Sequence, residues 1–240
     1  MKKLNKLFFS LAVSFAILCG GVGLNMLGFS ANTNANLSYA ATSFSGGSGT
    51  GTDPYLISNA EQLSYLAQVI NSSTTNSTYK NKNYKLTNDI DLGGKIWTPI
   101  GTNSSLPFVG RFDGNGYAIK NLTIDPTITV DYLGLFGYVG STTDGEGGST
   151  IVDFVLENVS ILSSTICKSE NSKYVGAVVG YVAKANAISN IFVKSGKIEG
   201  SNYVGGIIGS TNTNVEIYSC KNQADVYGNN SDKNSVVRVG

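Results

Sequence analysis

Residues 131–139 read Asp-Tyr-Leu-Gly-Leu-Phe-Gly-Tyr-Val, and versions of this phrase occur twice more in the chain. Residues 174–182 read Tyr-Val-Gly-Ala-Val-Val-Gly-Tyr-Val, and residues 203–210 read Tyr-Val-Gly-Gly-Ile-Ile-Gly-Ser. Each copy has an aromatic or apolar lead-in, one or two small residues, two large apolar residues and a closing glycine. Repetition on this scale is typical of a solenoid, in which each unit buries its apolar face only against its neighbours.

A second repeat lies between the glycine phrases. Six-residue segments that begin with Ile align without gaps at residues 119–124, 151–156, 188–193 and 217–222. The third position holds a small polar residue in each copy: Asn121, Asp153, Asn190 and Ser219. Side chains alternate along a straight strand, so the apolar first and fourth positions cannot both face a core from one strand. We therefore expect the third residue to lie at a bend, in the left-handed backbone region that Asn and Asp tolerate.

Further positions extend the repeat. Apolar residues follow three of the starting Ile residues after ten, ten and nine positions, at Ile161, Ile198 and Val226. Stacked in successive coils, these positions would form aligned polar and apolar ladders. The pattern predicts an all-β fold, a parallel β-helix, in which the glycines permit tight bends and close approach of coils. Gly137 and Gly180 lie 43 residues apart, which fits either two irregular coils or one coil with a long insertion.

One helix is predicted ahead of the repeats, over residues 60–70. Ser58 and Glu61 have the spacing of a capping box, which would satisfy two free backbone donors. Four apolar residues would share one face of this helix: Leu63, Leu66, Ala67 and Ile70. An amphipathic helix in this place is expected to cap the open end of the repeat core.

The chain divides into four parts. Residues 1–40 are predicted as a signal peptide, residues 41–52 as a flexible lead-in, residues 53–116 as the N-terminal cap and first coils, and residues 117–240 as repeats. The final segment, Val-Val-Arg-Val-Gly at 236–240, resembles the opening of a fourth glycine phrase. A closing cap is not recognisable after it, which leaves open a truncation at the C-terminus.

The N-terminus carries the firmest functional signal. Three Lys within residues 1–6 precede an apolar run over residues 7–18, the pattern of a secretory signal. A small-x-small site predicts cleavage after Ala40, with Ala35 as the alternative; an uncleaved membrane anchor is a further alternative. The expected location is secreted or cell surface, with membrane contact only through the signal segment during export.

Composition excludes several function classes. The chain has 29 Gly, 13 Tyr, 14% charged residues and no His. Removing residues 1–40, which hold three Lys and no acid, leaves 14 basic and 16 acidic residues, so no nucleic-acid partner is predicted. Without His, a zincin site and Ser-His-Asp or Cys-His catalysis are excluded within this chain. Cys167 and Cys220 are not expected to pair, and Cys220 is predicted as a buried apolar thiol because it replaces a ladder residue.

At residues 134–137, Gly-Leu-Phe-Gly resembles the GLUG motif of exported bacterial repeat proteins. Flanking segments are similar to the same proteins: residues 53–57, 88–92, 97–101 and 112–117. The resemblance covers residues 44–240 and implies a right-handed, pectin-lyase-like β-helix on secreted and surface proteins. Such repeats accompany adhesins, surface-layer-anchored proteins and some immunoglobulin-A-cleaving metallopeptidases. The repeat is not known as catalytic, so it implies no active-site residue.

Acidic residues are the candidates for chemistry. Polysaccharide lyases and hydrolases use acid clusters, with Ca²⁺ and basic residues in lyases. Asp89, Asp91 and Asp113 are therefore candidate catalytic residues, with Lys120 or Arg111 as possible bases. The competing interpretation, which we favour, places Asp89 and Asp91 towards solvent and Asp113 in a tight turn. An Asp-Gly-Glu-Gly-Gly segment at residues 144–148 resembles part of a Ca²⁺ loop but lacks a third spaced acid, so no metal site is predicted.

Tyrosines are the candidates for binding. Tyr138 and Tyr181 occupy equivalent positions in the glycine phrases, as do Tyr174 and Tyr203. Such rows could stack on sugar rings, or the rings could stack on one another along the solenoid, which is commoner.

Taken together, these patterns predict a non-catalytic, exported β-helix module for surface attachment that binds a glycan or host matrix. The alternatives are a carbohydrate-active enzyme and the N-terminal spacer of a larger surface protein such as a metallopeptidase.

Overall fold

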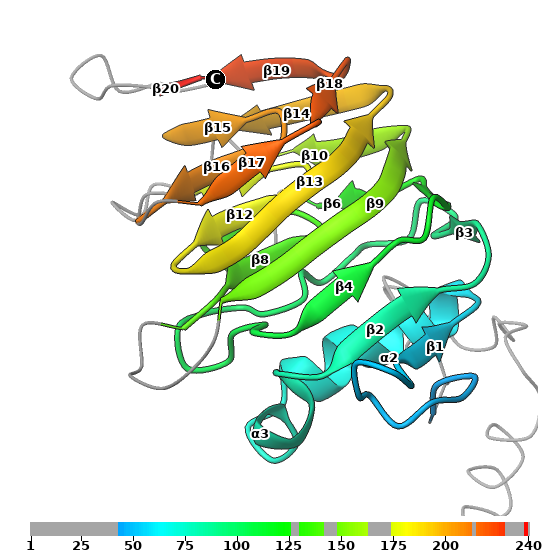
Figure 1. Ribbon diagram of the computed structural model, residues 1–240. Coiled ribbons are helices and arrows are strands. Elements are labelled where there is room, and N and C mark those ends of the chain that lie inside the picture. The colour runs from blue at the N-terminus through cyan, green and yellow to red at the C-terminus, as the bar shows by residue number, and fades with distance from the viewer. Residues whose placement is uncertain are drawn as a thin grey trace, which may run out of the picture. The chain divides into compact units, whose positions relative to one another are not determined.

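The computed structural model describes residues 43–125, 130–141, 148–162, 174–212, 215–228 and the backbone of 238–239. This part of the chain is all-β, with parallel sheets and two helices (Figure 1). The predicted signal peptide, the acidic loop at 144–147 and Cys167 lie outside the described residues. Among the described helices, none has the length and apolar character needed to span a membrane.

Four sheets contain the strands, and every strand pairing within them is parallel. The largest sheet contains β1 (Tyr55–Ile57), β2 (Asn83–Leu86), β3 (Ile90–Asp91), β4 (Arg111–Asp113), β5 (Ala118–Lys120), β9 (Ser149–Glu157), β13 (Ala185–Val193), β17 (Glu216–Tyr218) and β18 (Lys221–Asn222). A second sheet contains β6 (Thr123–Ile124), β10 (Val159–Leu162), β14 (Gly196–Gly200) and β19 (Asp225–Gly228). A third contains β7 (Tyr132–Leu133), β11 (Tyr174–Gly176), β15 (Tyr203–Gly205) and β20 (Arg238–Val239). The fourth contains β8 (Phe136–Val139), β12 (Val179–Val182) and β16 (Ile208–Thr211).

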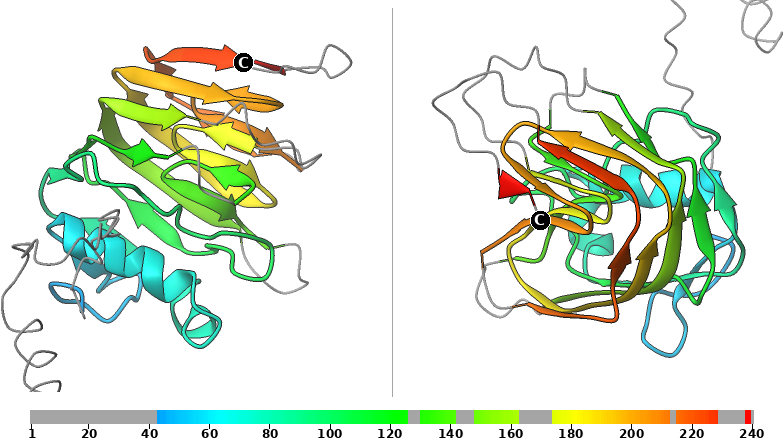
Figure 2. Two further views of the ribbon diagram at one scale, coloured as in Figure 1. Left: turned by 180° about the vertical axis from the view of Figure 1, so that it is seen from behind. Right: turned by 90° about the horizontal axis from the view of Figure 1, so that it is seen from above.

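One passage of the chain through these sheets is a coil, and each coil pairs directly with the next. The strands β9, β10, β11 and β12 form one coil and pair respectively with β13, β14, β15 and β16 of the following coil. Figure 2 shows these strands stacked side by side, with the helix α2 (Ala60–Ile70) at one end and β19 at the other. In register, Ile151 pairs with Ile188, and Ile188 pairs with Ile217. The apolar ladder predicted for these three copies is confirmed.

The predicted bends are also confirmed. The third residue of every six-residue segment has a positive φ: Asn121 (58°), Asp153 (62°), Asn190 (54°) and Ser219 (55°). A left-handed residue in the middle of the segment breaks the strict alternation of strand side chains. The apolar residues on both sides of the bend therefore reach the same core: Ile151 and Phe154 are both buried, as are Ile188 and Ile191.

The sequence alignment of the first copy was wrong. Ile119 pairs with Leu156, and the residue level with Ile151 is Phe112. The reason is that the coil of β9 has a second left-handed bend, at Asn158 (54°), and Asn158 Nδ2 donates to Asn121 Oδ1 at 2.6 Å. Asn121 therefore lies level with Asn158, and the alignment matched it to the earlier bend at Asp153.

The glycine phrases pair as predicted. Tyr174 pairs with Tyr132 and with Tyr203, and Val179 pairs with Phe136 and with Ile208. The long interval between the first two phrases is therefore one coil with an insertion. Backbone pairing of Tyr203 with residue 238 and of Val204 with residue 239 continues the series in β20.

An earlier copy of the glycine phrase was missed. Ile100 forms a parallel bridge with Phe136, and Tyr138 N donates to Gly101 O at 2.7 Å. Ile100 and Gly101 thus occupy the Phe136 and Gly137 positions of the preceding coil. No named strand contains them, and only two residues of the phrase remain recognisable.

Helix α2 has the predicted bounds, and its apolar face is buried: Leu63, Leu66, Ala67, Val69 and Ile70. Its cap differs from the prediction by one residue. Asn59 is the N-cap and accepts from Gln62 N at 3.0 Å, while Gln62 Oε1 accepts from Ser58 N at 2.8 Å. The side chain of Gln62 reaches back to Ser58, so Gln62 takes the place predicted for Glu61.

Side-chain amides join the helical region to the first coil. Asn71 Nδ2 donates to Pro99 O at 2.9 Å, and Asn71 Oδ1 accepts from Gly101 N at 2.9 Å. After α2, the short helix α3 (Asn76–Tyr79) places Asn76 Nδ2 within 2.7 Å of Ile70 O. These bonds satisfy backbone carbonyls that would otherwise be left without partners at the end of the core.

The ends of the repeat region differ in how they are covered. Residues 43–52 are tied down in part: Ser45 N donates to Leu56 O at 2.9 Å, and Phe44 stacks on Tyr55. At the last described coil, Ile217 is 49% exposed. Cys220 is half-buried, which corrects the prediction of a buried thiol, because no described coil covers that side; burial still raises the pKa of its thiol.

Candidate ligand-binding groove

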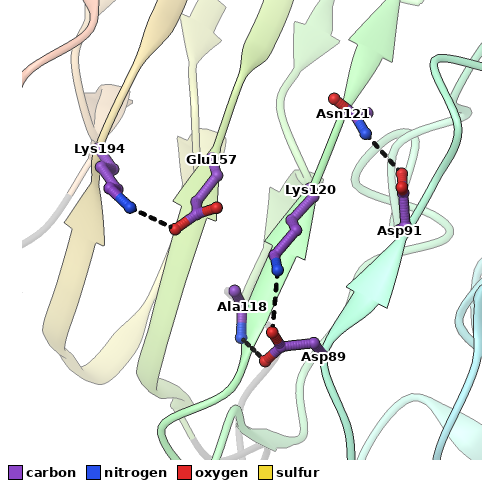
Figure 3. A network of polar contacts seen from close by, with 7 residues as sticks. All are labelled: Asp89, Asp91, Ala118, Lys120, Asn121, Glu157 and Lys194. Atoms are coloured by element: carbon purple, nitrogen blue, oxygen red, sulfur yellow. Dashed lines mark hydrogen bonds and ion pairs between the residues drawn. The ribbon is translucent and has the colours of Figure 1, made fainter.

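Asp89 is held by two donors on the neighbouring strand β5 (Figure 3). Its Oδ1 accepts from Ala118 N at 2.9 Å, and its Oδ2 forms an ion pair with Lys120 Nζ at 3.0 Å. The hydrogen bond from Ala118 N and then the Lys120 ammonium lower the pKa of the Asp89 carboxyl below its ordinary value. Both carboxylate oxygens are thus engaged.

Asp91 is held in a different way. Its Oδ1 accepts from Asn121 Nδ2 at 2.6 Å and from Gly93 N at 2.7 Å. These two bonds, with Asn121 first, lower the pKa of the Asp91 carboxyl. A lowered pKa disfavours proton donation near neutral pH, so neither Asp89 nor Asp91 suits a general acid.

These acids belong to a ladder of alternating charge across the largest sheet. Asp91 pairs with Lys120, and Lys120 pairs with Glu157, on successive strands. Lys194 in the next coil forms an ion pair with Glu157 at 2.8 Å (Figure 3). Opposite charges on neighbouring strands favour this register, and like charges would disfavour a slipped one. The ladder accounts for Asp89, Asp91 and Lys120 without a catalytic role.

Asp113 is the last residue of β4, where it pairs with Val152, and the predicted turn follows it with positive φ at Asn115 and Gly116. Its Oδ1 accepts from Asn115 N at 2.8 Å, and its Oδ2 pairs with Arg111 at 2.9 Å. In the described part of the chain, no three His, Cys, Asp or Glu side chains are grouped closely enough to hold a metal ion.

The candidate tyrosines form one cluster with a fifth ring, that of Tyr132. The rings of Tyr132, Tyr174 and Tyr203 stack in sequence, with centroids 5.5 and 4.8 Å apart and interplanar angles of 14° and 13°. Tyr181 lies 5.3 Å from Tyr138 and 5.1 Å from Tyr174. Burial raises the pKa of the hydroxyls of Tyr132, Tyr138 and Tyr174.

This arrangement favours a structural role for the cluster. The near-parallel rings of Tyr132, Tyr174 and Tyr203 turn their faces towards one another, and a bound sugar ring would need those faces. Tyr138 is only 8% exposed. The cluster therefore joins three coils along the third and fourth sheets.

A groove lies on the outer side of the largest sheet, over β4, β9 and β13. It is a shallow, open hollow with a volume of about 330 Å³. Its lining includes Asp113, Asn115, Asp153, Val155, Asn190 and Phe192. The partly exposed side chains of Val155 and Phe192 come from residues that pair directly on β9 and β13. They give the groove an apolar floor.

The polar wall of the groove is an Asp–Asn pair. Asn190 Nδ2 donates to Asp153 Oδ1 at 2.8 Å. Within the described residues, no protein group donates to Asp153 Oδ2 or to Asn190 Oδ1. Lys221 Nζ lies 5.1 Å from the centre of the Phe192 ring. The groove therefore offers free acceptors next to an apolar surface.

Sequence reasoning placed only Asp113 among the site candidates and missed the rest of the groove. Asp153 and Asn190 were recognised as bend residues of the ladder, which is correct but incomplete. One signal was available: Val155 and Phe192 each follow a bend residue by two positions, at places where the side chain points outward. Apolar residues on an outward face are a signal of binding when they fall next to one another.

Comparison with known proteins gives two relatives and one structure. No family model matches the chain. Halomucin of Haloquadratum walsbyi is 33% identical over 179 residues, which cover 71% of this chain and 2% of halomucin. A candidate Gly-rich membrane protein of Evansella cellulosilytica is 34% identical over 159 residues, which cover 64% of this chain and 16% of that protein. The chain thus matches a small part of each relative's length.

A crystal structure of a candidate immunoglobulin A1 protease from Bacteroides ovatus aligns with 77% of this chain and 70% of that protein. The TM-score is 0.40 and the sequence identity 19%, values that establish neither a shared fold nor a shared activity.

Proposed function

We propose that this chain is a non-catalytic module of an exported surface protein, and that it binds a glycan in the groove over β4, β9 and β13. The observation that carries the proposal is the Asp153–Asn190 pair, whose free acceptor oxygens stand beside the apolar floor of Val155 and Phe192. A sugar presents hydroxyl donors and apolar C–H groups on one ring. A hollow in which carboxylate and amide oxygens lie beside an apolar floor suits such a ligand.

Several observations support the class of protein. The GLUG-like phrase, the predicted signal peptide and the direct parallel pairing of coils agree with a right-handed β-helix of exported repeat proteins. The name of the Evansella cellulosilytica relative, a membrane protein, supports a surface or membrane-associated location. In this proposal the described region is one segment of a longer surface protein, as the short matched part of each relative suggests.

One observation favours the enzymatic alternative. Asp113 and Asp153 line the same groove, and glycosidases use two carboxyl groups that flank the scissile bond. Against it, both oxygens of Asp113 are held by Arg111 and Asn115 N.

The test is a glycan array on the purified protein, followed by titration calorimetry on the strongest ligand. We expect Asp153→Asn to weaken binding roughly tenfold, since hydrogen bonds to charged groups contribute about 1.5–3 kcal/mol. Phe192→Ala should also weaken binding. Asp225→Asn, which removes a carboxylate from the exposed end of β19, is the matched control and should leave affinity unchanged.

Two outcomes would contradict the proposal. Absence of binding to any glycan, with native circular dichroism, would remove the function. Wild-type affinity in both Asp153→Asn and Phe192→Ala would remove the site. Release of reducing ends from the bound glycan, lost in Asp113→Asn, would establish the enzymatic alternative in its place.

A further inference from the structure

A second hollow lies beside the groove on the same outer face. Its volume is about 340 Å³, and its lining includes Thr52, Asn83, Lys85, Arg111 and Asp113. Asp113 therefore lines both hollows. The two are neighbours across the sheet, because β2, β4, β9 and β13 are adjacent in that order.

The two hollows differ in charge. Lys85 pairs in register with Asp113 on the adjacent strand, but no carboxylate of the described residues forms an ion pair with the Lys85 ammonium. Arg111 gives one nitrogen to Asp113, and its other guanidinium donors remain, on a side chain that is 44% exposed. The second hollow thus carries an excess of positive charge, whereas Asp153 makes the wall of the first hollow negative.

The register gives the separation of the two charged regions. Neighbouring strands in a sheet lie about 4.7–4.9 Å apart. From Lys85 on β2 to Asn190 on β13 there are three such steps, roughly 15 Å. A ligand that occupies both hollows must therefore be elongated and must run across the strands.

We propose that the hollow at Lys85 and Arg111 is a subsite for an anionic sugar unit of the same ligand. The ligand is then a linear acidic polysaccharide, with a neutral, hydroxyl-rich unit at Asp153 and Asn190 and a carboxylate or sulfate at Lys85. This inference rests on the proposed glycan-binding function and names its ligand class.

The experiment is titration calorimetry on the purified protein with three oligosaccharides of equal length: neutral, uronate-containing and sulfated. We expect one of the two acidic ligands to bind more tightly than the neutral one. Lys85→Gln should weaken acidic binding about two- to fivefold, the range for exposed ion pairs, and leave neutral binding unchanged. Lys184→Gln is the matched control, because it removes the same charge from a residue that lines neither hollow.

Salt provides a second measurement that needs no variant. Raising ionic strength from about 0.01 M to 1 M shortens the screening length from about 30 to 3 Å. Acidic binding should weaken across this range, and neutral binding should not. Equal affinity for all three ligands, without a salt effect, would overturn the acidic subsite and leave glycan binding intact. Failure of all three ligands to bind would instead overturn the proposed function.

Discussion

Asn190 Nδ2 lies 2.8 Å from Asp153 Oδ1 in the adjacent coil, and both residues have left-handed backbone, with φ of 54° and 62°. The same two residues bend their strands and form the wall of the groove. A variant of Asp153 can therefore lose glycan affinity and keep its stability. Asn tolerates the left-handed backbone, so Asp153→Asn should leave the free energy of unfolding nearly unchanged.

Asp153→Val should destabilise the fold, since a β-branched residue is unfavourable at this φ. The left-handed region costs roughly 1–2 kcal/mol for residues other than Gly, Asn and Asp, and Val also loses the bond to Asn190. Urea unfolding of both variants tests this. Equal stability of the Asn and Val variants would show that the bend does not depend on residue type.

The contribution of an apolar ladder residue to the free energy of unfolding should depend on which coil it belongs to. Ile188 and Ile217 pair directly, yet Ile188 is fully buried and Ile217 is 49% exposed. We expect Ile188→Ala to cost about 2–5 kcal/mol and Ile217→Ala well under half as much. Chemical denaturation of the two variants measures the difference. Similar losses would mean that something covers Ile217 in the intact protein.

The coils approach so closely at the glycine phrase that any side chain at Gly180 should destabilise the fold. A Cβ at this position would lie 2.6 Å from Leu133 N and 2.9 Å from Tyr174 O, both backbone atoms that cannot rotate away. Gly180→Ala should destabilise by about 1–3 kcal/mol. Gly51, where an added Cβ meets nothing within 4 Å, is the matched control for thermal unfolding. A stable Gly180→Ala protein would contradict the tight stacking.

Acid should weaken the charge ladder. The pKa values of Asp89 and Asp91 are lowered from an ordinary value of 3.8 in the folded state. Their contribution to stability is therefore complete above about pH 3.8 and is lost as pH falls through the folded-state values. Stability measured between pH 7 and pH 2 should fall less in Asp89→Asn and Asp91→Asn than in the wild type. An unchanged acid profile in both variants would exclude the ladder as a source of the pH dependence.

The tyrosine cluster should matter for stability and not for binding. Tyr174 contacts the rings of Tyr132, Tyr181 and Tyr203, and such pairs contribute about 0.5–1.5 kcal/mol each. Tyr174→Leu should therefore lower stability by about 1–3 kcal/mol without changing glycan affinity. Tyr227→Leu, at a ring that is 48% exposed, should change neither. Loss of glycan affinity in a folded Tyr174→Leu protein would restore the cluster as a binding surface.

Local features of the structure were predictable residue by residue. The helix at 60–70 follows from its apolar spacing, and the bends at Asp153, Asn190 and Ser219 follow from residue type and the apolar residues on both sides. These predictions succeeded because backbone preference and side-chain direction depend on a few neighbouring residues. The helix cap failed by one residue because Ser58 and Asn59 are both suitable caps.

Predictions that needed two coils to be aligned were less accurate. The slip at Ile119 arose because Asn121 was matched to the bend at Asp153, whereas it lies level with a second bend at Asn158. The glycine phrase at Ile100 and Gly101 was missed because only these two of its residues are recognisable in the sequence. In both cases the backbone preferences within each segment were read correctly. The errors concern the register between two coils.

The sequence alone therefore determined that the chain is a parallel repeat with a helix before it, and where its strands bend, because these properties are encoded within short segments. Only the tertiary structure decided which coils pair in which register, and that Asp113, Asp153, Asn190 and Phe192 line one groove. The physical reason is that register depends on insertion lengths and on packing between coils. The oxygens of Asp153 and Asn190 that accept no bond within the described residues are known only from the pairing of these two residues across adjacent coils.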